Sequence, residues 1–105
     1  MEERRIEYRG LRLSPERLQV TLGEHTVDLS AKEALLLECL LTRPDHIVSR
    51  ERLLGMLWDE QDFVEENTLN VYITRLRKKL KHLGIEEALE TGRAWCRLSP
   101  LHNME

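Results

Sequence analysis

The chain has 105 residues, 41% of them hydrophobic and 33% charged, which is enough for one domain around a single core. Its apolar runs are shorter than the roughly 18 residues of a transmembrane helix, and residues 1–5 are not followed by the apolar segment of a secretory signal. We therefore expect a soluble, cytoplasmic protein or a fragment of one. The net charge of −3 argues at first against a nucleic-acid partner, but the charges are unevenly distributed along the chain.

The first quarter of the chain is predicted to form a small antiparallel sheet. Apolar residues at alternating positions predict one strand over residues 6–13, kinked at Gly10, and a half-buried strand over residues 18–22. The Gly-Glu pair at 23–24 has the length of a two-residue hairpin loop, which would return the chain as a further strand over residues 26–29.

Two helices with recognisable N-caps are predicted next. Ser30 followed by Glu33 has the spacing of a capping box, so a helix is expected from there to about Thr42. Leucines on most of its sides indicate that this helix lies at the centre of the core. Ser49 is expected to cap a second helix that ends near Trp58.

Five acidic residues directly precede a strongly basic stretch. Residues 67–82 contain five Lys or Arg and no acidic residue. A third helix is expected from about Thr68 to Lys81, with Asn67 or Thr68 as its cap and Gly84 as the glycine that ends it. The acidic residues, in a predicted loop, are Asp59, Glu60, Asp62, Glu65 and Glu66. The apolar residues of the helix share one face and are Leu69, Ile73, Leu76, Leu80 and Leu83.

The opposite face of this third helix suits the major groove of DNA, because it combines cationic, short polar and methyl-bearing side chains. Its residues are Asn67, Val71, Thr74, Arg75, Lys78 and His82. We expect Arg75 to contact a base edge or a phosphate and Lys78 to contact a phosphate. Val71 and Thr74 would read sequence through a thymine methyl and a base-edge hydrogen bond. The alternative is that these side chains are simply solvated and contact no DNA.

Further contacts are expected at the edges of that face. The backbone amides near Asn67 and Thr68 could hold a phosphate at the start of the helix. Arg77 and Lys79 lie on the flanks, where a phosphate contact and an ion pair with the acidic loop are equally expected.

The chain closes with two predicted strands, Leu89–Thr91 and Trp95–Leu98, around a turn that contains Arg93. A sheet, three helices and a C-terminal hairpin make an α+β fold of the winged helix-turn-helix type, in which the third helix reads the groove and the hairpin is a wing. Arg93 is expected to reach DNA from this wing. The predicted domain covers residues 6–98, between a linker remnant at 1–5 and a tail at 99–105.

Catalytic and metal-binding patterns are not evident in the sequence. Cys39 and Cys96 are expected to be buried, reduced thiols, and no pair of Cys or His has the spacing of zinc ligands. A glycine-rich phosphate loop and a nucleophile–histidine set are also missing. We therefore predict that the chain is not an enzyme and uses no cofactor.

Several segments resemble the DNA-binding effector domain of the OmpR/PhoB family of response regulators. They are residues 27–33, 36–40, 47–54, 57–58 and 67–80. The resemblance implies a four-stranded N-terminal sheet and a winged helix that binds promoter DNA, often at direct repeats and as a dimer. It also implies a receiver domain in the full-length protein, phosphorylated by a sensor kinase. The acidic loop would be the place of contact with RNA polymerase, with plain solvated charge as an equal alternative.

The start of the third helix, Asn67-Thr68-Leu69, is similar to the subgroup of these regulators that responds to cell-envelope stress and peptide antibiotics. Four positions depart from the family pattern. They are Ala34 for an aromatic residue, Asn70 for an acid, Tyr72 for a basic or polar residue, and Gly92-Arg93-Ala94-Trp95-Cys96 for the Arg-Gly-any-Gly-Tyr of the wing. Trp95 is expected to pack under the wing.

The altered wing and the acidic net charge leave alternatives open. One is a winged helix used mainly for protein–protein interaction, with weak DNA binding. Another keeps DNA binding but places the domain in a membrane-tethered activator.

Overall fold

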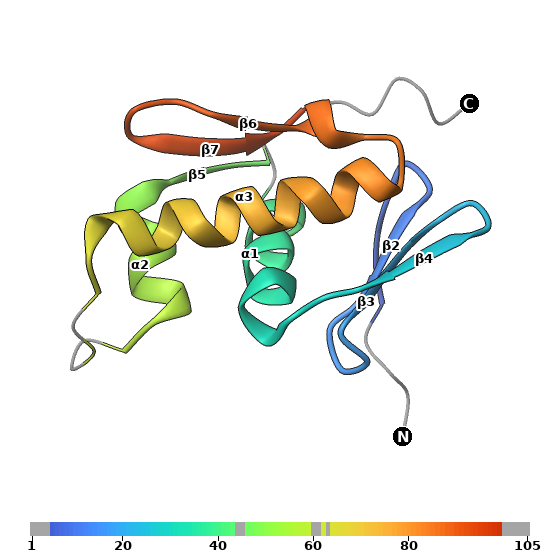
Figure 1. Cartoon of the computed structure of the whole chain (residues 1–105), viewed down its shortest axis with the longest axis horizontal. Coiled ribbons are helices and arrows are strands. Elements are labelled where there is room, and N and C mark those ends of the chain that lie inside the picture. Colours follow the sequence, from blue (N-terminus) through green and yellow to red (C-terminus); the bar gives the residue numbers. More distant parts are fainter. Residues whose placement is uncertain (1–4, 44–45, 60–61, 63, 100–105) are drawn as a thin grey trace.

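A computed structural model of the chain describes residues 5–43, 46–59, 62 and 64–99 (Figure 1). Three helices lie between two antiparallel sheets, which confirms the predicted α+β, winged-helix architecture. Within the described residues, every helix is too short or too polar to cross a membrane. The elements in chain order are β1 (Ile6–Tyr8), β2 (Leu11–Ser14), β3 (Gln19–Leu22), β4 (His25–Asp28), α1 (Ala31–Leu41), β5 (Ile47–Ser49), α2 (Arg50–Leu57), α3 (Glu66–His82), η1 (Glu86–Ala88), β6 (Leu89–Thr91) and β7 (Trp95–Leu98).

The N-terminal sheet has the order β1-β2-β3-β4, as the family resemblance implied. The prediction of one strand over residues 6–13 is wrong, because Tyr8 pairs with Leu11 and the chain reverses between them. Arg9 and Gly10 have φ values of 50° and 89°, the backbone of a type I′ turn, which matches the twist of the paired strands. The predicted hairpin loop at 23–24 is confirmed.

One strand of this sheet begins a residue later than predicted. Leu18 has a φ of 55° and lies outside β3. Its carbonyl nevertheless accepts a hydrogen bond of 2.8 Å from the N–H of Leu29, which extends the register of β3 and β4 by one pair.

Both predicted N-caps are present. The Ser30 hydroxyl accepts a hydrogen bond from the Glu33 N–H, and the Glu33 carboxylate accepts one from the Ser30 N–H. This capping box satisfies two backbone donors and also the carboxylate of Glu33, which is only 3% exposed. Ser49 caps α2 in the same way, through the N–H of Arg52.

The third helix begins earlier than predicted. Its N-cap is Glu65, so Asn67 and Thr68 are helical residues of the first turn and the expectation that one of them caps the helix is wrong. Acidic residues at 65–66 suit this position, because the first turn of a helix carries a partial positive charge. Glu66 accordingly belongs to α3 and no longer to the acidic loop.

The end of α3 is as predicted. Gly84 has a φ of 81°, and its N–H donates to Lys81 O while the N–H of Ile85 donates to Leu80 O. These two bonds form a Schellman motif, which satisfies carbonyls that the end of a helix leaves free. The chain then passes through η1 into the C-terminal hairpin.

The hairpin of β6 and β7 is confirmed, and a third strand joins it. The order is β5-β7-β6, with Val48 opposite Cys96. Because β5 runs directly into α2, the hairpin is attached to the start of that helix.

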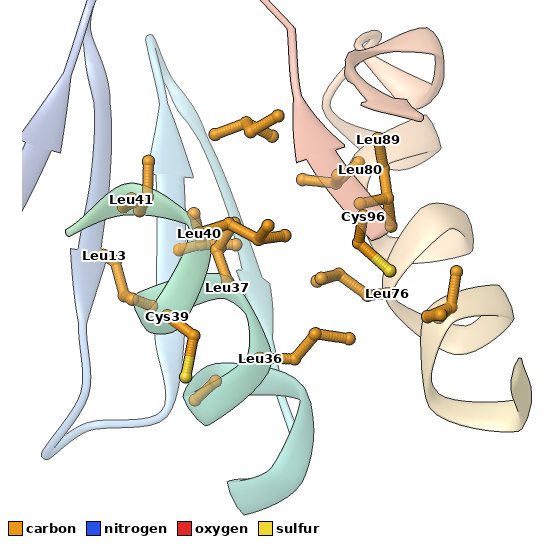
Figure 2. Packing of buried hydrophobic residues seen from close by; sticks show 14 of the residues in the cluster. Leu13, Leu36, Leu37, Cys39, Leu40, Leu41, Leu76, Leu80, Leu89 and Cys96 are labelled. Carbon is orange, nitrogen blue, oxygen red and sulfur yellow. The ribbon is translucent and has the colours of Figure 1, made fainter. Parts of the chain in front are cut away.

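The core is built mainly of leucine, and α1 lies at its centre. This helix packs against both α2 and α3 and against the N-terminal sheet. Figure 2 shows the leucines of α1 between Leu13 of β2 and Leu76 of α3. Both of those side chains are fully buried, and burying a leucine contributes about 1.5–3 kcal/mol. Cys39 and Cys96 are buried free thiols, as predicted.

Candidate nucleic-acid interface

The third helix has the two faces that its sequence predicts. The apolar stripe is buried in the core, with Leu76 and Leu80 fully covered. The opposite face is exposed and consists of Asn67, Val71, Thr74, Arg75, Lys78 and His82. Val71 is 40% exposed, which is unusual for an aliphatic side chain in this chain. The helix therefore presents an exposed cationic and polar surface on the side opposite its buried stripe.

The flank of α3 toward the wing is held by hydrogen bonds. Arg77 is half-buried and donates to the carbonyl of Leu89 in β6, at 3.0 Å. The alternative of an ion pair between Arg77 and the acidic loop is therefore not what the structure shows. Thr68, at the other end of the helix, is also half-buried, and its N–H donates to Glu65 O.

Arg50 is a residue that the sequence reasoning missed. Its guanidinium donates to the side-chain oxygen of Asn70 in α3, and its backbone N–H donates to Ala94 O in the wing turn. Arg50 thus joins α2, α3 and the wing at one point. Its sequence position directly after the N-cap Ser49 does not predict these partners, because they lie in distant parts of the chain.

A groove of about 370 Å³ lies between α2, α3 and the wing turn. The guanidinium-bearing residues Arg50 and Arg93 both line it. Its remaining lining residues are Ser49, Glu51, Leu54, Leu69 and Ala94. The wing turn and the first turns of α3 therefore line the same concave surface.

The tryptophan of the wing does not lie where the sequence predicted. Trp95 is 37% exposed, so it does not pack under the wing. Its indole ring instead lies against Gly92, where a β-carbon would overlap with it. Alternation in β7 buries Cys96 and Leu98 and leaves residue 95 on the outer face, which explains the difference. Arg93 is exposed in the turn, as its predicted contact with DNA requires.

The other flank of α3 carries an aromatic pair with two cations. Trp58 and Tyr72 meet edge to face, with ring centroids 5.8 Å apart. Lys32 lies over the Trp58 ring and Arg75 over the Tyr72 ring, at 5.3 and 5.4 Å from the ring centroids. Trp58 and Tyr72 are half-buried and pack against the core.

The acidic segment lies just before α3. Asp59, Asp62 and Glu65 are exposed, and the Asp62 carboxylate accepts a hydrogen bond of 2.9 Å from the Asp59 N–H. Glu60 lies outside the described residues. The exposed carboxylates of Asp59, Asp62 and Glu65 thus lie directly before α3.

The described residues hold no group of three or more His, Cys, Asp or Glu that could bind a metal ion. Burial raises the pKa of both thiols, with Glu38 adding to the effect at Cys39, and Arg50 and Arg77 partly opposing it at Cys96. A neutral, buried thiol is a poor nucleophile.

Comparisons with known proteins point to one family. The family model described as "Transcriptional regulatory protein, C terminal" matches residues 23–94. The chain is 45% identical to the transcriptional regulatory protein YxdJ of Bacillus subtilis (strain 168) over 91 residues, which are 87% of this chain and 40% of that protein. It is 38% identical to the response regulator protein GraR of Staphylococcus aureus (strain MRSA252) over 90 residues, 86% of this chain and 40% of that protein.

A solved structure shows the same fold. The C-terminal domain of the nisin resistance regulator NsrR, described as a lantibiotic response regulator, is 34% identical with a TM-score of 0.77. The match covers 92% of this chain and 99% of that domain. The chain thus corresponds to a complete domain of the solved protein but spans only about 40% of the length of the curated relatives.

Proposed function

This chain belongs to the family of C-terminal domains of transcriptional regulatory proteins of the OmpR/PhoB type, and from that premise we propose how it binds DNA. The exposed face of α3 enters the major groove, and the wing contacts the adjacent backbone or minor groove. The carrying observation is that α3 buries one face completely and exposes Arg, Lys, Thr and Asn side chains on the other.

Individual roles follow from side-chain chemistry and from position on the helix or wing. Arg75 contacts a base edge, and Val71 and Thr74 contact a thymine methyl and a base-edge acceptor or donor. The phosphate contacts, which position the domain without reading sequence, come from the exposed Asn67, Lys78, His82 and Arg93 and from the half-buried Thr68 and Arg77 at the flanks. We add Arg50, because it borders the groove between α3 and the wing together with Arg93.

The partners follow from the relatives. The chain matches proteins named as response regulators over about 40% of their length, so we propose that a receiver domain and a sensor kinase control it in a longer cytoplasmic protein. Binding as a dimer at direct repeats and contact of the acidic segment (Asp59, Glu60, Asp62, Glu65 and Glu66) with RNA polymerase are part of the same proposal. The similarity to a lantibiotic response regulator supports peptide antibiotics as the stimulus. The alternative of a domain used mainly for protein association gains no support from these relatives.

The test measures DNA affinity by fluorescence anisotropy. The probes are a duplex selected by this domain from a random pool and an unselected duplex of equal length. Arg75→Ala is expected to weaken binding to the selected duplex by about 1–3 kcal/mol and binding to the unselected duplex much less. Arg12→Ala is the matched control, because Arg12 is exposed on β2 of the N-terminal sheet.

Two outcomes would change the proposal. Equal losses on both duplexes would reassign Arg75 to a phosphate contact. If the wild-type domain selected no duplex and bound none at low salt, DNA recognition by the isolated domain would be refuted.

A further inference from the structure

Arg75 is the base-reading residue of the proposed function, yet a free arginine is poorly suited to that task. Its side chain is long and exposed, and fixing such a side chain costs up to about 2 kcal/mol of conformational entropy. A bidentate contact with guanine also needs the plane of the guanidinium in one orientation. A group that holds Arg75 in its binding orientation before DNA arrives will therefore raise the affinity for the correct sequence.

Tyr72 provides such a restriction. It precedes Arg75 by three residues on α3, so the two side chains share one side of the helix. The guanidinium carbon of Arg75 lies over the Tyr72 ring, 5.4 Å from the centroid, within the range of a cation–π interaction. Such an interaction uses the face of the guanidinium and leaves its edge N–H groups free to donate to a base.

The Tyr72 ring is itself fixed by the core. Its edge-to-face contact with Trp58, at 60° between the ring planes, restricts its rotation. Trp58 packs against the core and is covered on another side by Lys32 from the first turn of α1. The order of contacts is therefore Lys32, Trp58, Tyr72, Arg75, which connects α1, the end of α2 and the DNA-facing side of α3.

We propose that Tyr72 is a positioning residue for Arg75, which raises affinity for the specific DNA sequence without contacting a base. This inference rests on the proposed DNA binding and deepens it. It also gives a role to a position where the family resemblance leads one to expect a basic or polar residue. The ring, and not the hydroxyl, carries the effect.

The first experiment compares Tyr72→Leu and Tyr72→Phe on the selected and unselected duplexes. Tyr72→Leu is expected to weaken binding to the selected duplex by about 2- to 5-fold, the size of an exposed cation–π interaction. Binding to the unselected duplex should change less, and Tyr72→Phe should behave like the wild type. In the Arg75→Ala background, Tyr72→Leu should have no further effect, because the residue that it positions is gone. Tyr8→Leu is the matched control, since Tyr8 in β1 has Arg9 over its ring but lies on the N-terminal sheet.

The second experiment examines the protein without DNA. The face of an aromatic ring shields nearby protons, so the side-chain protons of Arg75 should resonate upfield in NMR spectra of the wild type and of Tyr72→Phe. They should return to ordinary positions in Tyr72→Leu. Thermal unfolding establishes that the variants are folded, and Tyr72→Met replaces Tyr72→Leu if the latter is not.

Several results would overturn the inference. These are an unchanged or tighter affinity in the folded Leu or Met variant, a loss in Tyr72→Phe as large as in Tyr72→Leu, or additive effects in the double variant. An Arg75 spectrum that is the same with and without the ring would refute it even if no DNA were bound. Failure of the wild type to bind any DNA, with the upfield shift present, would refute the proposed function and the effect on affinity, but not the restraint of Arg75 by Tyr72.

Discussion

The side-chain oxygen of Asn70 accepts a hydrogen bond from the guanidinium of Arg50, which ties the first residue of α2 to α3. The family resemblance places an acid at position 70, so an amide here keeps the acceptor but lacks the charge. Because Arg50 also donates its N–H to Ala94 O, this bond helps to hold the recognition helix and the wing together.

Restoring the acid should strengthen this connection. Asn70→Asp is expected to raise the free energy of unfolding by about 0.2–1 kcal/mol, because Asn70 is exposed, Arg50 is only half-buried, and an ion pair at the surface contributes little more. Urea unfolding at low and high salt measures the change. The gain should disappear at high salt and in an Arg50→Gln background, and its persistence in either condition would show that the pair is not its source.

Two glycines in helical surroundings should respond in opposite directions to alanine. Gly84 has a φ of 81°, so Gly84→Ala is expected to lower the free energy of unfolding by about 1–2 kcal/mol. Gly55 lies within α2, where a β-carbon would meet no atom within 4 Å, so Gly55→Ala should raise it by up to about 1 kcal/mol. Chemical unfolding of both variants gives the comparison. An unchanged or higher stability of Gly84→Ala would contradict the left-handed explanation, and a loss in Gly55→Ala would contradict the helix-propensity explanation.

Adjacent lysines of α3 should differ in their effect on DNA binding. Lys78 is exposed on the DNA-facing side, whereas the ammonium of Lys79 donates to Asp28 O at 2.8 Å. Lys78→Ala should reduce the slope of log affinity against log salt by about 0.9, the value for one phosphate contact. Lys79→Ala should leave the slope unchanged. The measurement is anisotropy on one duplex over a series of salt concentrations, and equal slopes for the two variants would refute the assignment.

The two thiols should make stability fall at high pH. Burial raises the pKa of Cys39 and Cys96 above the ordinary value of 9.0, so the folded chain holds these protons more tightly than the unfolded chain does. Their contribution to the free energy of unfolding is fully present below about pH 9 and is lost as the pH rises through the folded pKa. Urea unfolding of the wild type and of the double variant Cys39→Ala, Cys96→Ala, at about pH 7 and about pH 10, separates the contribution of the thiols from that of other titrating groups. A pH dependence equal in both proteins would exclude the thiols as its cause.

Features fixed by neighbouring residues were predictable from the sequence. The capping box at Ser30 and the glycine at position 84 need only contacts within a few residues, and both were predicted correctly. The two faces of α3 were predictable for the same reason, since helical periodicity alone separates them. The roles of its exposed residues in DNA binding remain predictions.

Features that depend on contacts between distant segments were not predictable. The pairing of β5 with β7 and the bond from Arg50 to Asn70 join parts of the chain that no local pattern connects. The reversal at Arg9-Gly10 could have been predicted from the sequence. The apolar positions change from even numbers in β1 to odd numbers in β2, which a single continuous strand would not show. The start of α3 was misplaced because Asn67 and Thr68 are strong capping residues, whereas the actual cap, Glu65, makes no side-chain hydrogen bond.

The attachment of the wing to β5 has a consequence for how a DNA target is chosen. Since β5 pairs with β7 and continues into α2, the wing is joined to the helices, and we expect it to move little relative to α3. In the proposed binding mode, a duplex whose groove widths differ from their separation has to deform to make both contacts. The energy of this deformation depends on base steps that the domain does not touch, so the stiffness of the operator will contribute to selectivity beside the side chains of α3.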